Sequence, residues 1–272
     1  MTSASPAKRW QRTLGIVGGL GPHAHIAFEK QLLAAVGAVA SDQDYPPWIV
    51  SSLPATPDRT QALIADGPTP VPALVASLRN LEGRADFAVV ACNTAHAFLE
   101  EAQAQVKIPV LNVIRETVEE LRARLPLGSR IGLLATTGTL RAAVYERTSA
   151  AAVGEDLVWR SLLDEPSRRG LQDSLVMSSI YGSASSEGRG HGGLKAGLLQ
   201  DPETGEPFAD RLGRAVDELL RQGCSAVVLG CSEIPLALTG PSGLPAPLVD
   251  PMQIAADRCL RIASGELPLP VG

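Results

Sequence analysis

Two cysteines of this chain stand in matching positions, each directly after a short aliphatic run. Residues 85–94 read Ala-Asp-Phe-Ala-Val-Val-Ala-Cys-Asn-Thr, and residues 224–233 read Cys-Ser-Ala-Val-Val-Leu-Gly-Cys-Ser-Glu. Cys92 and Cys231 therefore each follow a predicted buried strand and precede the start of a predicted helix. A helix N-terminus favours the thiolate and also binds anionic groups. If the two segments face each other, one thiol can remove a proton from a carbon while the other delivers a proton to the opposite face.

Two buried small residues in related strands are the alternative interpretation, because buried cysteines are common in protein cores. The matched repeat around Cys92 and Cys231 favours the catalytic interpretation. Cys224 and Cys259 have no such context, and we expect them in the core. Four cysteines in 272 residues are too few for a disulfide framework. We therefore expect free thiols and a cytoplasmic protein.

Two cations stand in segments that could meet a carboxylate. Arg59 follows a predicted strand in Pro57-Asp58-Arg59-Thr60, where its guanidinium can hold a carboxylate through two hydrogen bonds or simply be solvated. Lys195 lies in the glycine-flanked segment 192–197. It could be a flexible-loop cation, a second carboxylate contact or a Schiff-base lysine for pyridoxal phosphate. The chain has no clear phosphate-binding element, and this disfavours pyridoxal phosphate.

Polar residues near these cysteines allow two interpretations each. Thr136 and Thr139 follow a predicted strand, where their hydroxyls can bind a carboxylate or cap the next helix. His96 lies one helical turn after Cys92 and can tune that thiol or pack in its helix. The glycine turn at 18–22 departs from the dinucleotide-binding pattern, so we interpret it as a tight turn at the floor of a cleft. No histidine has metal-ligand spacing, and we expect neither a metal nor a cofactor.

Short aliphatic runs alternate with stretches of helical spacing, and this alternation predicts an α/β protein with parallel sheets. The predicted strands are 14–17, 48–50, 87–91, 109–113, 131–135, 225–229 and 247–249. Predicted helices are marked by Ile26, Leu32, Leu33 and Val36, by Val71, Leu74, Val75 and Leu78, and by Val216, Leu219 and Leu220. The carboxyl ends of such strands are where ligands bind, and both cysteine motifs lie there.

The chain repeats itself with offsets of about 139 and 117 residues, which predicts two similar α/β halves. Residues 14–21 align with residues 131–138 in the same way as the two cysteine segments align. We expect a first domain over 13–114, completed by the C-terminal segment 246–272, and a second domain over 115–245. A Gly/Ser-rich stretch near 182–207 has no counterpart in the first half, and we interpret it as an insertion.

Composition excludes several classes of protein. With 45% hydrophobic residues the chain can bury a core, so disorder is not its main state. A net charge of −5 gives no basic footprint for nucleic acid or for an anionic membrane. The apolar runs are far shorter than the roughly 20 residues of a membrane span. The polar N-terminal stretch does not resemble a secretion signal.

At these motifs the chain resembles the aspartate/glutamate racemase family, most closely its aspartate racemase branch. The matching segments follow the family's order over about residues 13–264. They are Gly18-Gly19-Leu20-Gly21-Pro22, Pro57-Asp58-Arg59-Thr60, Ala91-Cys92-Asn93-Thr94-Ala95-His96, Gly132-Leu133-Leu134-Ala135-Thr136 with Gly138-Thr139, Lys195-Ala196-Gly197 and Leu229-Gly230-Cys231-Ser232-Glu233-Ile234-Pro235. The resemblance implies two pseudo-symmetric α/β domains with the active site in the cleft between them, no cofactor and a homodimer.

The resemblance also implies roles for individual residues. Cys92 and Cys231 would be the two acid/base thiols. The implied contacts of the substrate's α-carboxylate are Asn93 and Thr94, helped by Ser232, and Arg59 and Lys195 would grip its side-chain carboxylate. We therefore predict inversion at Cα of an acidic amino acid, aspartate and also glutamate.

Three alternatives stay open at this point. Within the superfamily they are a hydantoin racemase and a maleate isomerase, although Arg59 with Lys195 favours a dicarboxylate over a hydantoin. From a different class, a non-catalytic small-ligand-binding protein on a Rossmann-like scaffold fits the same pattern. Exchange of the Cα proton of L-aspartate in D₂O separates the enzymes from the binding protein.

Overall fold

The computed structural model describes residues 10–154, 156–182, 192–239 and 247–271. Two parallel sheets of four strands form its centre, with the strand orders β2-β1-β3-β4 and β6-β5-β7-β8. Their strands are β1 (Leu14–Gly18), β2 (Trp48–Ser52), β3 (Phe87–Val90), β4 (Val110–Leu111), β5 (Ser129–Leu134), β6 (Leu157–Arg160), β7 (Ala226–Leu229) and β8 (Leu248–Val249). The identical strand order confirms the prediction of two similar α/β halves.

Helices separate consecutive strands, as right-handed parallel crossovers require. The α-helices are α1 (Pro22–Val36), α2 (Arg59–Ile64), α3 (Val71–Arg79), α4 (Leu99–Gln103), α5 (Val113–Arg124), α6 (Thr137–Arg141), α7 (Val144–Val153), α8 (Arg169–Leu171), α9 (Ser178–Tyr181), α10 (Phe208–Arg221), α11 (Ile234–Leu238) and α12 (Pro251–Ala263). A π-helix, η4 (Gln172–Met177), joins α8 to α9. The 3-10 helices are η1 (Asp42–Asp44), η2 (Thr94–Phe98), η3 (Pro166–Arg168) and η5 (Leu194–Ala196).

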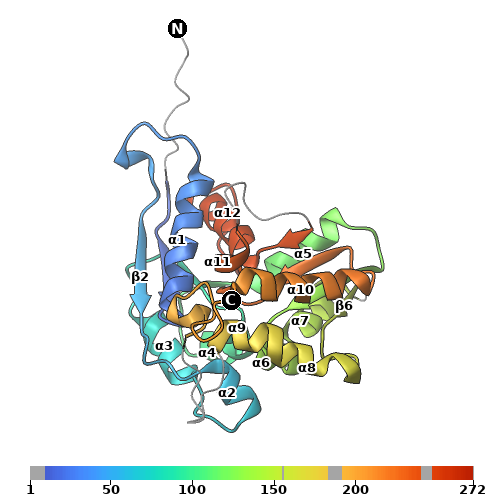
Figure 1. Ribbon diagram of the computed structural model, residues 1–272. Coiled ribbons are helices and arrows are strands. Elements are labelled where there is room, and N and C mark those ends of the chain that lie inside the picture. The colour runs from blue at the N-terminus through green and yellow to red at the C-terminus, as the bar shows by residue number, and fades with distance from the viewer. Residues whose placement is uncertain (1–9, 155, 183–191, 240–246, 272) are drawn as a thin grey trace.

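The first sheet is buried on both faces, because alternate residues of its central strands point to opposite sides. Ile16 and Val89 pack with α1 and α12, whereas Val17 and Val90 pack with α3 and α4. All five residues of β1 and all four of β3 are buried. Figure 1 shows this half, coloured blue to cyan, on the left, with red α12 beside α1.

The second sheet is covered in the same way. Leu134 and Leu229 pack against α10 and η4 on one face. Ile131 and Val228 pack against α5 and α7 on the other face. Because both sheets are parallel, the carboxyl ends of β1 and β3 and those of β5 and β7 each form one edge, and these two edges carry the cysteine motifs.

The chain crosses between the halves twice. It leaves β4 and enters α5 at Val113, close to the expected division after residue 114. It returns after β8, which pairs with β7 and so belongs to the second sheet. Within the expected segment 246–272, β8 pairs with the second sheet, and α12 from Pro251 on packs with the core of the first half.

The sequence missed one strand and did not predict which face of α1 is buried. Strand β6 was not predicted, because only every second residue of Leu157–Arg160 is buried and an arginine ends the strand. In α1 the side chains of Ile26 and Leu33 are 46% and 41% exposed. The buried face of α1 is formed instead by Ala24, His25, Phe28 and Leu32, because the helix turns its bulky Phe28 to the sheet.

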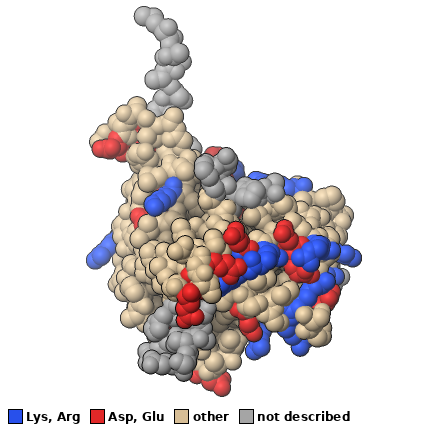
Figure 2. Space-filling view, viewed as in Figure 1, with Lys and Arg blue, Asp and Glu red and all other residues tan. Residues whose placement is uncertain are grey.

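The described surface carries charges of both signs. Figure 2 shows basic and acidic side chains interspersed along and beside α10. Several of them form ion pairs, such as Arg214 with Glu206 and Arg168 with Glu218. Among the described residues no helix combines the length and the apolar character needed to span a membrane. The polar N-terminal stretch up to residue 9, and residues 183–191 of the expected insertion, lie outside the described residues.

Candidate functional site

Both cysteines line one closed cavity between the two halves of the chain. Cys92 is 5% exposed and Cys231 is 4% exposed. The cavity wall consists of Arg59, Thr60, Cys92, Asn93, Thr94, Thr136, Tyr181, Lys195, Cys231, Ser232 and Glu233. Every residue predicted for the site except Thr139 is in this wall. The structure therefore brings together residues that are up to 174 positions apart in the sequence, from Arg59 to Glu233.

The same hydrogen bond positions each cysteine turn. The N–H of Ala91, just before Cys92, donates to the carbonyl of Val17 at 3.1 Å. In the second half the N–H of Gly230, just before Cys231, donates to the carbonyl of Leu134 at 2.8 Å. Each turn is thus tied to the central strand of its own sheet. The helices that follow are short, since η2 and α11 have five residues each, so their dipoles are smaller than the motifs predicted.

His96 supports the Cys92 turn through its backbone rather than its thiol. The Nε2 atom accepts from the N–H of Val113 at 3.1 Å, so Nδ1 carries the proton and donates to the carbonyl of Cys92 at 2.9 Å. Burial lowers the pKa of His96 to about 4, and the ring is neutral. Of the two interpretations of His96, the structure favours the packed histidine.

Asn93 is oriented by a tyrosine of the other half. The hydroxyl of Tyr145, in α7, donates to Asn93 Oδ1 at 2.6 Å. Tyr145 is fully buried, and Asn93 is 1% exposed. The Nδ2 atom of Asn93 has no hydrogen-bond partner although it is buried. The amide therefore presents an unused N–H₂ donor in the cavity wall, which suits an anionic ligand group.

Four threonine hydroxyls form a buried cluster across the two halves. Thr94 Oγ1 lies 2.8 Å from Thr139 Oγ1 and 3.3 Å from Thr136 Oγ1. Thr60 donates to Thr136 Oγ1 at 3.1 Å. Thr136 also caps α6, accepting from the N–H of Thr139. Thr136 therefore serves as a helix cap and lines the cavity, while Thr139 lies behind the wall and its hydroxyl bonds those of Thr94 and, at 3.1 Å, Thr136.

Arg59 is buried instead of solvated, with 6% of its surface exposed. Its guanidinium donates to the backbone carbonyls of Leu20 and, at 3.1 Å, of Pro57, and its Nε is buried without a partner. Burial lowers the pKa of Arg59, but the negative charges that Cys92 and Asp58 carry when ionised raise it more. Arg59 is thus a fixed positive charge beside the first cysteine.

The second cysteine faces an ion pair. Lys195 Nζ lies 3.1 Å from Glu233 Oε1, and the thiol of Cys231 donates to Glu233 Oε2 at 3.1 Å. The hydroxyl of Ser232 also donates to Glu233 Oε2, at 3.3 Å, and approaches the carbonyl of Ala91 across the halves at 3.5 Å. The Lys195 Nζ lies 5.3 Å from the centre of the Tyr181 ring.

This ion pair sets the protonation of its neighbours. Burial and the Glu233 carboxylate raise the pKa of the Cys231 thiol well above its ordinary value, so Cys231 is protonated here. Burial alone would raise the pKa of Glu233, but Lys195 lowers it below its ordinary value. Burial likewise lowers the pKa of Lys195, and Glu233 reverses the shift to a net rise. A protonated Lys195 is the opposite of what imine formation with pyridoxal phosphate needs.

Sequence reasoning missed three residues of the cavity wall. Glu233 stood in the quoted repeat, opposite Thr94, but its carboxylate was treated only as part of a polar pair. Thr60 adjoins Arg59 in the quoted segment, and a hydroxyl alone gives no signal. Tyr181 precedes the Gly/Ser-rich stretch, and its hydroxyl donates to Asp58 Oδ2 at 3.1 Å. That contact joins residues 123 positions apart, and no local pattern predicts it.

The glycine turn lies against this ion pair. Gly19 and Gly21 have φ of 80° and 141°, a region that L side chains rarely adopt. A Cβ on Gly21 would lie 2.1 Å from Glu233 Oε1, and one on Gly19 would lie 2.4 Å from the backbone of Leu53. The turn therefore works as a close-approach turn, as the sequence predicted.

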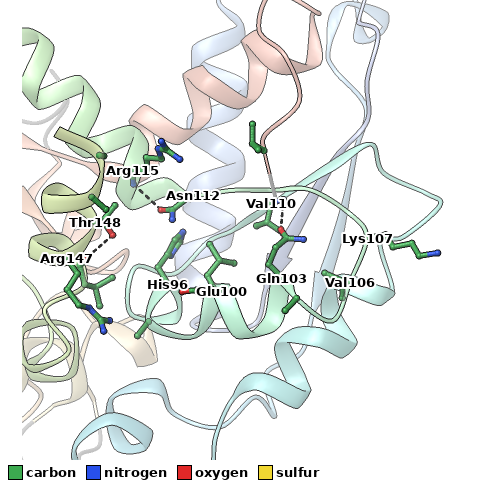
Figure 3. A pocket seen from close by; sticks show the side chains of 17 residues that line it. His96, Glu100, Gln103, Val106, Lys107, Val110, Asn112, Arg115, Arg147 and Thr148 are labelled. Atoms are coloured by element: carbon green, nitrogen blue, oxygen red, sulfur yellow. Dashed lines mark hydrogen bonds between the residues drawn. The ribbon is translucent and has the colours of Figure 1, made fainter. Parts of the chain in front are cut away.

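The cavity is nearly filled by its own side chains. Its free volume of about 10 Å³ is no more than one water molecule needs. A larger hollow of about 960 Å³ lies between η2, α4 and α7, where His96, Glu100 and Arg147 line it (Figure 3). Neither cysteine belongs to that hollow. An amino acid can reach the thiols only when the walls of the small cavity move apart.

The side chains of the cavity wall suit anion binding and proton transfer. Within the described ranges no group of three or more His, Cys, Asp and Glu side chains could hold a metal ion. The cavity wall offers two cations, two thiols, a free amide N–H₂ and several hydroxyls. Such a set can bind carboxylates and move a proton between two sulfur atoms.

Comparison with known proteins gives one family. The model of the Asp/Glu/Hydantoin racemase family matches residues 17–163. A broad specificity amino-acid racemase of Bacillus subtilis is 26% identical over 146 residues, which are 49% of this chain and 59% of that protein. The chain thus aligns with about three fifths of this curated relative's length.

Two solved structures share the fold. An aspartate racemase of Picrophilus torridus superposes with a TM-score of 0.71 and 24% identity, covering 94% of this chain and 95% of that one. A glutamate racemase of Francisella tularensis in complex with D-glutamate gives a TM-score of 0.56 and 17% identity, covering 96% and 84%. At these identities the two structures establish the two-domain α/β fold.

Proposed function

We propose that this chain, which belongs to the Asp/Glu/Hydantoin racemase family, is a cofactor-independent racemase that inverts Cα of an acidic amino acid. One observation carries the proposal. Cys92 and Cys231 come from equivalent turns of two similar halves and line a single buried cavity. Inversion at a carbon requires two acid/base groups, since either enantiomer must meet a base on one side and an acid on the other.

In the proposed reaction one thiolate removes the Cα proton and the opposite thiol donates its own proton to the other face. The two cysteines then have exchanged protonation states, so the product enantiomer is the substrate of the reverse reaction. Cys231 is protonated in the resting form, as described above, and is the acid of the first step. Cys92, beside the fixed charge of Arg59, is the base of that step.

The negative charge that develops on the substrate's carboxylate needs donors. We assign the α-carboxylate to Asn93, Thr94 and Ser232, because Asn93 has a free N–H₂ and the hydroxyls are in the same wall. Thr136, with Thr139 behind it, completes this side of the cavity. No step uses pyridoxal phosphate or a metal.

The side-chain carboxylate of the substrate is assigned to Arg59 and Lys195. Both are cations in the wall of one cavity, and their charges also offset the negative charge of a thiolate. Aspartate is the first candidate, and glutamate and a broader range of amino acids follow from the named relatives. We further propose domains divided at about residue 114, with α12 completing the first, and a cytoplasmic homodimer.

A panel of amino acids tests this function. Purified protein is incubated with the L- and D-forms of aspartate, glutamate, alanine and serine, and the enantiomers are separated by chiral chromatography. We expect conversion of aspartate from both directions to a 1:1 mixture without added cofactor. If no member of the panel racemises, the chain is not an amino-acid racemase, and binding without turnover would favour a non-catalytic ligand-binding protein.

A further inference from the structure

Glu233 is the one carboxylate among the described residues of the cavity wall. It is 2% exposed and lies between a cation and a thiol. Oε1 faces Lys195 at 3.1 Å, and Oε2 receives the thiol proton of Cys231 at 3.1 Å. A Cβ on Gly21 would lie 2.1 Å from Oε1, so the glycine leaves the room that the carboxylate occupies. The carboxylate is thus held by a cation and a thiol beside the glycine turn.

An amino acid brings an ammonium group into this cavity, and the rest of the wall suits it poorly. Arg59 and Lys195 repel it, and Asn93 Oδ1 is already occupied by the Tyr145 hydroxyl. Hydroxyls and thiols are weaker acceptors of a charged donor than a carboxylate is. A buried cation without an anionic partner is strongly disfavoured. Glu233, next to one of the two sulfur atoms between which Cα must lie, is the acceptor that remains.

We propose that Glu233 binds the ammonium group of the substrate and that Lys195 leaves Glu233 for the substrate's side-chain carboxylate. The Lys195–Glu233 ion pair is then a resting arrangement that a zwitterionic dicarboxylate opens and replaces by two new ion pairs. This inference rests on the proposed function, because it places an amino acid between Cys92 and Cys231.

The exchange leaves neither Lys195 nor Glu233 without a partner of opposite charge. Before binding, each of the two protein charges has its partner, so neither is left unpaired in the low-dielectric interior. After binding, each has a substrate group of the same sign as the partner it lost. The small free volume of the cavity fits this description, since substrate groups take the places that the protein's own pair fills. A ligand without the ammonium group would leave Glu233 without a partner, because Lys195 would have moved to the ligand's carboxylate.

The exchange therefore predicts the ligand class. A free α-ammonium and a second carboxylate should both be needed for tight binding. Succinate is aspartate without its ammonium group, so it can attract Lys195 but offers nothing to Glu233. Racemic aspartate is the matching probe, because a racemase does not change its composition during a binding measurement.

The experiment measures the affinities for racemic aspartate and for succinate by titration calorimetry. The proteins compared are wild type, Glu233→Gln and Glu233→Asp. Glu218→Gln is the matched control, because Glu218 is also buried and ion-paired, with Arg168 at 2.5 Å, but lies outside the cavity. We expect wild type and Glu218→Gln to prefer aspartate over succinate by about ten- to a hundredfold, which is the range for a hydrogen bond to a charged group. In Glu233→Gln this preference should fall to near one, and Glu233→Asp should restore part of it.

Two results overturn the proposal in different ways. If Glu233→Gln weakens the binding of both ligands equally and keeps the preference for aspartate over succinate, Glu233 does not bind the ammonium group. That result would leave the proposed racemase activity unaffected. If wild type binds neither ligand, the acidic amino-acid substrate itself is wrong and this inference falls with it. Thermal unfolding of each variant by circular dichroism confirms that the compared proteins are folded, and Glu233→Asp serves in place of Glu233→Gln if the latter does not fold.

Discussion

Removing the Tyr145 hydroxyl tests whether the second half of the chain positions the Asn93 amide, which we propose to bind the substrate's α-carboxylate. In Tyr145→Phe the ring keeps its place beside Trp159, with ring centroids 5.2 Å apart, and only the donor to Asn93 Oδ1 is lost. That hydrogen bond is buried and 2.6 Å long. Its loss leaves a buried oxygen without a partner, which costs about 1–3 kcal/mol of unfolding free energy.

The effect on activity follows from the orientation of the amide. Without the Tyr145 hydroxyl, nothing described in the structure decides whether Oδ1 or Nδ2 of Asn93 faces the cavity. A hydrogen bond from Nδ2 to a carboxylate is worth about 1.5–3 kcal/mol. We therefore expect kcat/KM of Tyr145→Phe to fall by roughly ten- to a hundredfold at most.

A double-mutant cycle separates this role from a general loss of packing. Steady-state kinetics are measured for Tyr145→Phe, Asn93→Ala and the double variant, with Tyr45→Phe as a control outside the cavity wall. If Tyr145 acts through Asn93, the double variant should be no slower than Asn93→Ala alone. Additive losses, or wild-type kcat/KM in Tyr145→Phe, would refute the positioning role.

Further predictions concern charge and pH. Arg59→Leu and Lys195→Leu should each lower kcat/KM for aspartate by about ten- to a hundredfold but affect alanine much less; equal losses on both substrates would show that these cations do not read the side-chain carboxylate. Burial raises the pKa of Asp250 to about 6, so the folded state binds the extra proton and stability declines as pH rises from about 4 to 6. In Asp250→Asn the side chain of Gln31 can turn so that its unpaired Oε1 accepts a hydrogen bond from the new amide. We therefore expect urea unfolding to show that this variant is more stable than wild type by up to roughly 3 kcal/mol at pH 7.5, and by less at pH 4.5. Equal changes in unfolding free energy at both pH values would contradict this prediction. His96, with its pKa lowered to about 4 by burial, has the opposite sign, so wild type should lose stability through this group as pH falls from about 6.5 to 4.

The sequence predicted the strands that are buried on both faces, because their aliphatic runs have no other stable environment. Strand β6 was not predicted by this criterion, because its residues alternate between buried and half-exposed positions. The buried face of α1 was also not predicted. Ile26 and Leu33 have helical spacing but are exposed, whereas Phe28 is the residue that the sheet covers. Patterns of hydrophobicity predict where helices and strands lie. Which face of a helix is buried is decided only when the helix packs against the sheet.

The cavity wall shows the same division. Cys92 and Cys231 were predicted from the repeat, because two related halves place equivalent turns at equivalent strand ends. The partners of Lys195 and Asn93 were not predictable, since Glu233 and Tyr145 reach them over 38 and 52 positions of the chain. Local patterns contain no information on such contacts. The sequence therefore identified most side chains of the cavity wall and missed those that orient them.

The most direct test of the account is the exchange of the Cα proton in D₂O. Wild type, Cys92→Ser and Cys231→Ser are incubated with L- and D-aspartate, and the Cα–H signal is followed by NMR alongside chiral analysis. The account predicts that wild type racemises either enantiomer with uptake of one deuteron at Cα. Each serine variant should be slower by about a hundred- to ten-thousandfold while remaining folded. Near wild-type racemisation in either variant would contradict the two-thiol mechanism.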